Sequence, residues 1–317
     1  MSGGAASSML QTLLSSPASK WAVGGWSLFI AENLILSENR SKIMEMVGGD
    51  DNYHYLYGTL SSVAMASTGY GYFYHVRNAQ PLLCSSAKCM PMPFKVGGLI
   101  CLSMGFGIAS QTAPKAQIPI TMNNNNNTLT TTNTDSGNKW KVRCPFDFTD
   151  SRSATHIDNN NDGSNSNSGG EMVKLSTADR ISRHPGLFSF GLVSLGYGLL
   201  LPSLPTQLFF SMPLLVAVVG GAHTDSRHRR GMGGQLSPAI EQQTSLLPFY
   251  ALLTNDDNNV IRNLQEFWTH DVKGINLALS IGLASLIVLR KGRGINTHIH
   301  HTTTTSSSSL RKSLIPQ

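Results

Sequence analysis

The sequence has few charged residues and lacks the motifs of several large enzyme classes. Only 13% of its 317 residues are charged, and it contains no P-loop, Rossmann glycine fingerprint, HExxH helix or nucleophile elbow. Lys and Arg (24) outnumber Asp and Glu (18), which gives a formal net charge of +6. The basic residues stand in twos and threes beside apolar segments and do not form one aromatic-interleaved run. We therefore expect membrane-flanking anchors and no nucleic-acid partner.

Cysteine is also scarce, and its spacing gives no redox or zinc motif. The four cysteines form no CxxC pair; they are Cys84, Cys89, Cys101 and Cys144. The run CSSAKCMPM, which begins at Cys84, groups soft ligands that suit Cu(I). An interhelical loop that happens to carry sulfur is the simpler interpretation. The cysteines leave the redox compartment open.

Hydrophobic residues make up 40% of the chain, which is low for a membrane protein. The average hides long Asn-, Ser- and Thr-rich tracts in a predicted low-complexity insert, 115–174, and in a predicted disordered tail, 294–317. The N-terminus, 1–20, is Ser- and Ala-rich without acidic residues, and we expect a flexible segment there, with or without a transit peptide. Within the insert, WKVRCPFDFTD (140–150) is predicted to be an ordered island that docks on the helices, unless its aromatics cluster by chance.

Outside these tracts the chain contains six apolar segments. They cover about 21–36, 56–74, 96–110, 187–201, 205–221 and 275–289. Most are slightly shorter than the ~20 residues that cross hydrocarbon, so a soluble bundle is the competing interpretation. The last three have almost no polar stripe, and small residues are frequent, as in GLVSLGYG. We predict an all-α integral membrane bundle of five or six spans, with helices in 21–114, 175–253 and 254–293.

The fourth and fifth segments are separated only by PSLP, which begins at Pro202. Its two prolines cannot continue a helix, so the chain must turn back and re-cross the bilayer. The basic residues before the fourth segment and after the fifth then share one side, and the positive-inside rule makes that side cytosolic or stromal. Six strict crossings would put the basic C-terminal cluster, 290–293, on the other side. Either one segment is re-entrant or the rule fails at one end.

The densest cluster of donors stands at the start of the fourth segment, in RISRHPGLF. Pro185 suits the first position of a helix, which would place His184 at its N-cap. Ser176 and Asp179 have the spacing of a capping box. The free amides of a helix start attract anions, and Arg180 and Arg183 add planar guanidinium groups. The simpler alternative is that these side chains only anchor the helix in the headgroup layer.

A second cluster, HTDSR, follows the fifth segment on the same edge. The expected helical hairpin brings His184 and His223 to similar depth. Asp225 is then available to orient an imidazole. Arg227 lies one turn past His223, on its face of the helix.

These motifs, in this order, resemble the NnrU family of integral membrane proteins. RHP before an apolar hairpin, the following HTDSR, EQQTSLLPFYALL downstream and the basic, Tyr-containing loop SENRSKIMEMVGGDDNYHYLYG upstream carry the resemblance. It covers roughly 21–114 and 175–253 and skips the insert. The family includes bacterial proteins linked to denitrification and the plant zeta-carotene isomerase.

The resemblance implies a haem-dependent cis–trans isomerase of carotenoids in a plastid membrane, with a hydrophobic polyene substrate. It implies haem b bound by His184 and His223, with Arg180 and Arg183 holding propionates. Asp225 and Arg227 would orient the ligands. One position departs from the family: a histidine expected late in the first span is replaced by Glu32 and Asn33. His54 and His75, on either side of the second segment, are the substitute ligands that the sequence offers.

Two other functions stay open. RHP before a membrane hairpin also resembles the isoprenylcysteine and phospholipid methyltransferases, which use S-adenosylmethionine and carry a paired-glutamate motif after the hairpin. This chain has only Glu241 in that region, so methyl transfer is less favoured than isomerisation. The third hypothesis is a non-catalytic membrane scaffold or ligand-binding protein. The sequence does not indicate an oligomeric state.

Overall fold

The computed structural model describes residues 15–79, 90–112, 120–122, 140–142, 180–254, 265 and 267–293. All six predicted apolar segments are helical. The helices are α2 (Pro17–Glu38), α3 (Arg40–Val47), α4 (Asp50–Gly71) with a π-helical turn η1 (Tyr72–Val76), α5 (Met92–Thr112), α7 (Pro185–Leu199), α8 (Leu204–Arg229), α9 (Pro238–Gln243), α10 (Tyr250–Thr254), η4 (Phe267–Asp271) and α12 (Gly274–Arg293).

Several predictions fall outside these residues. They include the Cys84–Cys89 cluster, Cys144, the capping pair Ser176 and Asp179, the tail 294–317 and most of the insert. Within the insert, β1 (Ile120–Met122) pairs with β2 (Trp140–Val142) in an antiparallel ladder, with Thr121 opposite Lys141. The predicted island thus begins with a strand, while its residues 143–150 lie outside the described part.

The first helical pair begins and turns where its local sequence requires. Ser16 caps α2 by accepting a hydrogen bond from the Ser19 amide (3.1 Å), and Pro17 takes the first position, where its missing amide costs nothing. The helix therefore starts inside the predicted flexible N-terminus, 1–20. After α3 the chain reverses at Gly48 and Gly49, whose φ angles of 82° and 133° are ones that side chains with a Cβ disfavour.

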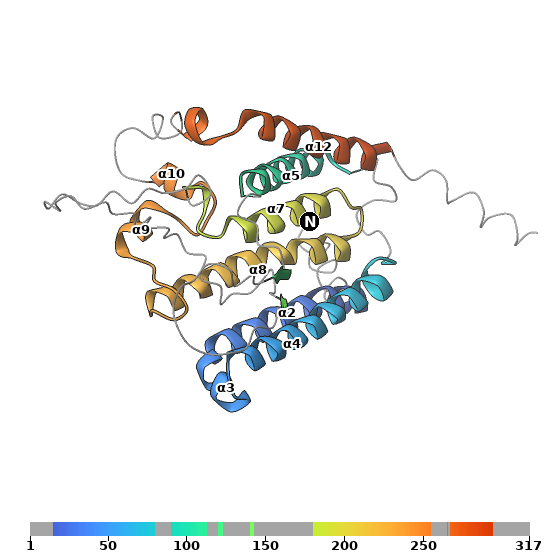
Figure 1. Ribbon diagram of the computed structural model, residues 1–317. Coiled ribbons are helices and arrows are strands. Elements are labelled where there is room, and N and C mark those ends of the chain that lie inside the picture. The colour runs from blue at the N-terminus through green and yellow to red at the C-terminus, as the bar shows by residue number, and fades with distance from the viewer. Residues whose placement is uncertain are drawn as a thin grey trace, which may run out of the picture.

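The six long helices lie side by side in one row, in the order α12, α5, α7, α8, α2, α4 (Figure 1). Consecutive helices of the chain run in alternating directions. We name the end where α7 begins and α8 finishes the Arg183 end, and the end that holds the turn between them the PSLP end. At the PSLP end, Thr206 donates a hydrogen bond to the Val76 carbonyl (3.4 Å). At the Arg183 end, Arg230 pairs with Glu38 (2.6 Å).

The last helix, α12, runs the full length of the row. Near the start of α12, Asn276 donates a hydrogen bond to the Ser110 carbonyl (3.3 Å) at the Arg183 end. Near its finish, the Lys291 ammonium lies 4.8 Å from the centroid of the Tyr197 ring, at the PSLP end. The basic C-terminal residues of α12 therefore lie at the end opposite Arg183.

Close contact between α5 and α7 depends on glycine, as the frequency of small residues predicted. A Cβ added to Gly105 would lie 2.8 Å from the Val193 amide nitrogen, and one added to Gly196 would lie 2.8 Å from the Leu102 amide nitrogen. These distances are too short for any side chain, so the two backbones touch directly. Such packing is typical of helices in lipid.

Within the described residues, three helices are long and apolar enough to cross a membrane: Met92–Gln111, Leu204–Arg229 and Gly274–Lys291. α7 is apolar but has only 15 residues. On α12, Ile275, Leu279 and Leu286 are 65–77% exposed, an apolar surface that water would disfavour. The protein is therefore a helical protein with three candidate membrane spans.

Candidate functional site

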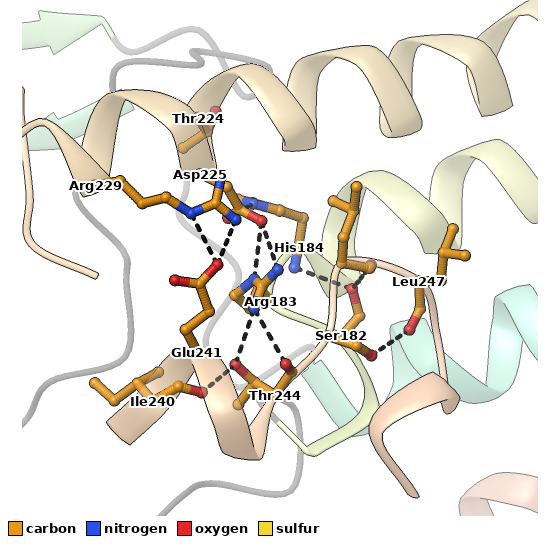
Figure 2. A network of polar contacts seen from close by, with 12 residues as sticks. Ser182, Arg183, His184, Thr224, Asp225, Arg229, Ile240, Glu241, Thr244 and Leu247 are labelled. Carbon is orange, nitrogen blue, oxygen red and sulfur yellow. Dashed lines mark hydrogen bonds and ion pairs between the residues drawn. The ribbon is translucent and has the colours of Figure 1, made fainter. Parts of the chain in front are cut away.

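The start of α7 lies against the segment that joins α9 to α10, although the two are more than 60 residues apart. The Arg183 amide donates to the Ser245 carbonyl (3.0 Å), and the Phe249 amide donates to the Ile181 carbonyl (2.8 Å). Ser182 adds a side-chain hydrogen bond to the Leu246 carbonyl (2.7 Å), drawn in Figure 2. The RHP and TSLLPF elements thus form one local structure at the Arg183 end.

His184 occupies the N-cap of α7, and Pro185 takes the first helical position, which confirms the predicted helix start. The imidazole lies against the backbone of α8: a Cβ added to Gly221 would come within 2.9 Å of its Cδ2 atom. Gly221 therefore allows the ring to approach Asp225, one helical turn further along α8.

Asp225 is the centre of a buried ionic cluster (Figure 2). Its Oδ2 atom lies 2.9 Å from both Nε and Nη2 of Arg183, and its Oδ1 atom lies 2.9 Å from Nε2 of His184. The three side chains are only 4%, 11% and 13% exposed. Arg183 Nη1 donates to the Thr244 carbonyl (3.1 Å). A buried charge needs such partners, since leaving one unpaired costs several kcal/mol.

Arg183, which the sequence predicted to bind an anionic ligand, instead pairs with a side chain of the protein. In this structure the Arg183 guanidinium is directed at Asp225 and Thr244. Arg180 is half-buried and precedes Arg183 by three residues. Asp225 contacts His184, the arrangement that orients an imidazole and fixes its tautomer. Further out, Arg229 and Glu241 form an exposed pair with Nη2 and Oε1 2.5 Å apart.

His223 lies on a different face of α8 from this cluster. It is two residues from both Gly221 and Asp225, which is about 200° around the helix. Its Nε2 atom lies 3.2 Å from the Ser37 hydroxyl of α2. Arg227, one turn further, donates to the same hydroxyl (2.8 Å), so these two share a face as their spacing predicted.

The structure therefore does not bring His184 and His223 together. The His184 imidazole lies on the side of α8 next to α7, and the His223 imidazole lies on the side next to α2, with the backbone of α8 between them. This arrangement does not fit the two axial ligands of one haem, which must approach one iron from opposite sides of a single porphyrin.

The other candidate ligands are also apart from the Asp225 cluster. His54 is half-buried one turn after the start of α4, with its Nε2 atom 3.4 Å from Asp50 Oδ2. His75 stacks on Trp21 at the PSLP end, with ring centroids 5.1 Å apart. Asn33, which replaces the family histidine, is fully buried. Among the residues that the structure describes, no three His, Cys, Asp or Glu side chains gather to hold a metal ion.

Sequence inspection missed three contributors to this end of the molecule. Ser37 links α2 to α8, Thr244 receives Arg183, and His228 is 3% exposed, packed beside Gly234. The helical period continued through HTDSRHR would have indicated His228, because it lies three residues after Asp225. The other two contacts depend on distant segments.

A shallow, open groove lies between the finish of α2 and the finish of α8, on the face of α8 that carries His223. Its lining is apolar on one side and polar on the other, and comprises Leu34, Ile35, Glu38, Asn39, His223, Ser226 and Arg230. Arg230 Nη1 and Nη2 donate to the two carboxylate oxygens of Glu38 (2.6 and 2.9 Å) at its edge. The groove thus offers a positive and a negative group beside a hydrophobic wall.

The chain matches no family model, no curated protein and no solved structure.

Proposed function

We propose that this protein is a multi-pass membrane protein of the NnrU type that binds a zwitterionic amphiphile at the Arg183 end. The alternating directions of six apolar or amphipathic helices support a row in which each long helix crosses the bilayer. α2 and α4 are less apolar than the three candidate spans, and their polar side chains face one another, as in Tyr57 and Asn33. Buried between helices, such groups are tolerated in lipid.

The groove between α2 and α8 is the observation that supports ligand binding. Arg230 offers a planar guanidinium suited to a phosphate oxygen. Glu38 offers a carboxylate to an ammonium group. Leu34 and Ile35 provide the wall for an acyl chain. The exposed Arg230–Glu38 pair contributes little by itself, so a ligand that pairs with both groups can replace it at small cost.

Native mass spectrometry of the detergent-purified protein, offered phosphatidylcholine, tests this function. We expect the wild type to retain the lipid and the Arg230→Ala/Glu38→Ala variant to retain several-fold less. The matched control is Arg229→Ala/Glu241→Ala, which removes an equally exposed ion pair outside the groove. Equal retention by the two double variants contradicts the proposal. Stronger retention of phosphatidylglycerol than of phosphatidylcholine would replace the zwitterionic ligand with an anionic one.

Haem-dependent isomerisation of a polyene is the second candidate, and one observation favours it. The 2.9 Å contact between His184 and Asp225 is the carboxylate–imidazole arrangement that orients a metal-binding histidine. His184 would then be a single ligand without His223, and a bound haem would supply the electronic chemistry of isomerisation. The visible spectrum of the purified protein tests it: a Soret band that His184→Ala removes and His75→Ala keeps supports haem. If the protein remains colourless after haem has been added, haem-dependent isomerisation is excluded.

A further inference from the structure

A group of polar side chains lies between α2 and α4, apart from the cluster around Asp225; its carboxyl group, Glu32, is half-buried. Ser61 Oγ donates toward the Glu32 carboxyl, 3.0 and 3.3 Å from its two oxygens. Asn33 Nδ2 lies 2.8 Å from Oε2 of the same group, and the Tyr57 hydroxyl donates to Asn33 Oδ1. Asn33, Tyr57 and Ser61 are 0%, 2% and 4% exposed.

This group lies well inside the proposed bilayer. α2 has 22 residues and is therefore about 33 Å long, close to the ~30 Å hydrocarbon core. Glu32 stands six residues before the end of the helix, roughly 9 Å along its axis. Ser61 lies at the middle of α4. The depth of Glu32 rests on the proposed function, in which α2 crosses the membrane.

Glu32 has polar neighbours but no cationic one within the described part of the chain. The Glu32 carboxyl contacts the Ser61 hydroxyl and the Asn33 amide. On α8, Arg227 and His223 contact Ser37, a full turn beyond Asn33. An ionised carboxylate without a counter-ion is expensive in hydrocarbon, and such a group takes up a proton instead.

Polar groups connect this carboxyl to one end of the molecule only. Toward the Arg183 end, Asn33 is followed one turn later by Ser37, which meets His223. Toward the PSLP end, the same faces pack as an apolar cluster. Its buried members are Ala22, Trp26, Phe29, Ala64, Val76, Phe209, Met212 and Val216. Thr68, also buried toward that end, donates to the Ala64 carbonyl of its own helix, so it does not continue the polar group of Glu32 and Ser61.

We propose that Glu32 is a proton-binding carboxyl group inside the membrane that exchanges its proton with water at the Arg183 end. The carboxylate takes up one proton and becomes a neutral acid. Its hydroxyl can then donate a hydrogen bond to Ser61 Oγ. On ionisation the same proton returns to water at the Arg183 end, the end toward which Ser37 and His223 continue the polar side chains of α2 and α8. No other reactant is needed.

Infrared difference spectroscopy of the full chain in lipid vesicles tests the site. At neutral pH we expect a carboxylic-acid C=O band that Glu32→Gln removes and Glu38→Gln keeps, since Glu38 is exposed. Glu32→Asp should shift this band without removing it, which separates loss of the carboxyl from loss of the fold. Absence of the band from the wild type, or a band that persists in Glu32→Gln, overturns the proposal. So does a band that sodium chloride removes at constant pH, since sodium is then the ligand.

Direction of access is tested by the exchange of the acid proton for deuterium, measured as the isotope shift of the same band. Ser37→Ala and His223→Ala should slow this exchange several-fold, and Thr68→Ala, on the other side of Ser61 along α4, should not. Equal exchange rates in all three overturn the path. The lipid variants of Arg230 and Glu38 leave Glu32 unchanged, so a protonated Glu32 without lipid retention disproves the proposed function alone. Lipid retention with an ionised Glu32 disproves this inference alone.

Discussion

At the scale of single residues, Asp225 holds the Arg183 end together. Its two carboxylate oxygens accept from Arg183 and His184, which directly precede α7, and Arg183 also donates to the Thr244 carbonyl. The neighbouring pair, Arg229 and Glu241, has similar chemistry but is 48% and 36% exposed. Because water screens an exposed pair and leaves a buried one to its partners, the two should differ sharply in their effect on stability.

We expect Asp225→Asn to lower the free energy of unfolding by about 3–5 kcal/mol, because it leaves Arg183 buried beside a neutral amide. Glu241→Gln should cost less than ~1 kcal/mol. Thermal unfolding of both variants in the same detergent, converted to free energies, measures the difference. Similar losses from the two variants would mean that the buried cluster is no stronger than a surface pair.

The contribution of the Arg229–Glu241 pair to stability should depend on pH. The hydrogen bond from Arg229 holds the pKa of Glu241 below its ordinary value of 4.5. A carboxyl whose pKa falls on folding stabilises the protein above its unfolded pKa, and the stabilisation is lost as the pH falls through the folded pKa. Between pH 7 and pH 3, the wild type should therefore lose its small advantage over Glu241→Gln below about pH 4.5. An advantage that grows with acid would reverse the assigned sign.

At the scale of elements, the contact between α5 and α7 depends on the absence of side chains. Gly196→Ala should destabilise the protein by about 1–3 kcal/mol, because the added methyl group meets the backbone of α5 at Leu102. Gly282→Ala, on α12, is the matched control, since nothing lies within 4 Å of the added Cβ. It should be neutral or slightly stabilising, as alanine is the better helix former. Thermal unfolding of the two variants checks this, and equal melting points would contradict it.

The sequence predicted the positions of the helices better than it predicted which side of a helix each polar side chain occupies. Apolar composition and prolines predicted six helices and the turn after α7, because these signals are local. The same signals ended the fifth segment at Gly221, whereas α8 continues to Arg229. That extension turns His223 toward α2 and Asp225 toward His184. The contacts of Ser37 and Thr244 could not be predicted, since they join segments more than 60 residues apart.

At the scale of the whole molecule, six alternating helices bring the start of α2 and the finish of α12 to the same end. We expect single cysteines at Ser15 and Arg293, in a chain without its native cysteines, to react with a membrane-impermeant maleimide from the same side of sealed vesicles. A cysteine at Lys42, between α2 and α4, should react from the other side. Labelling of Ser15→Cys and Arg293→Cys from opposite sides would mean an odd number of crossings.

The unequal lengths of α7 and α8 have a consequence for the surrounding lipid. With 15 and 26 residues, these neighbours are about 22 and 39 Å long. They are joined by a tight turn at the PSLP end, so the whole shortfall falls beside the start of α7. In the proposed topology, in which α7 and α8 both cross the membrane, we expect a bilayer with a ~30 Å core to become thinner there or to let headgroups move toward Asp225. Hydrophobic mismatch of this kind should enrich the protein in thin membranes. It should also thin the bilayer locally beside the buried Arg183–Asp225 pair.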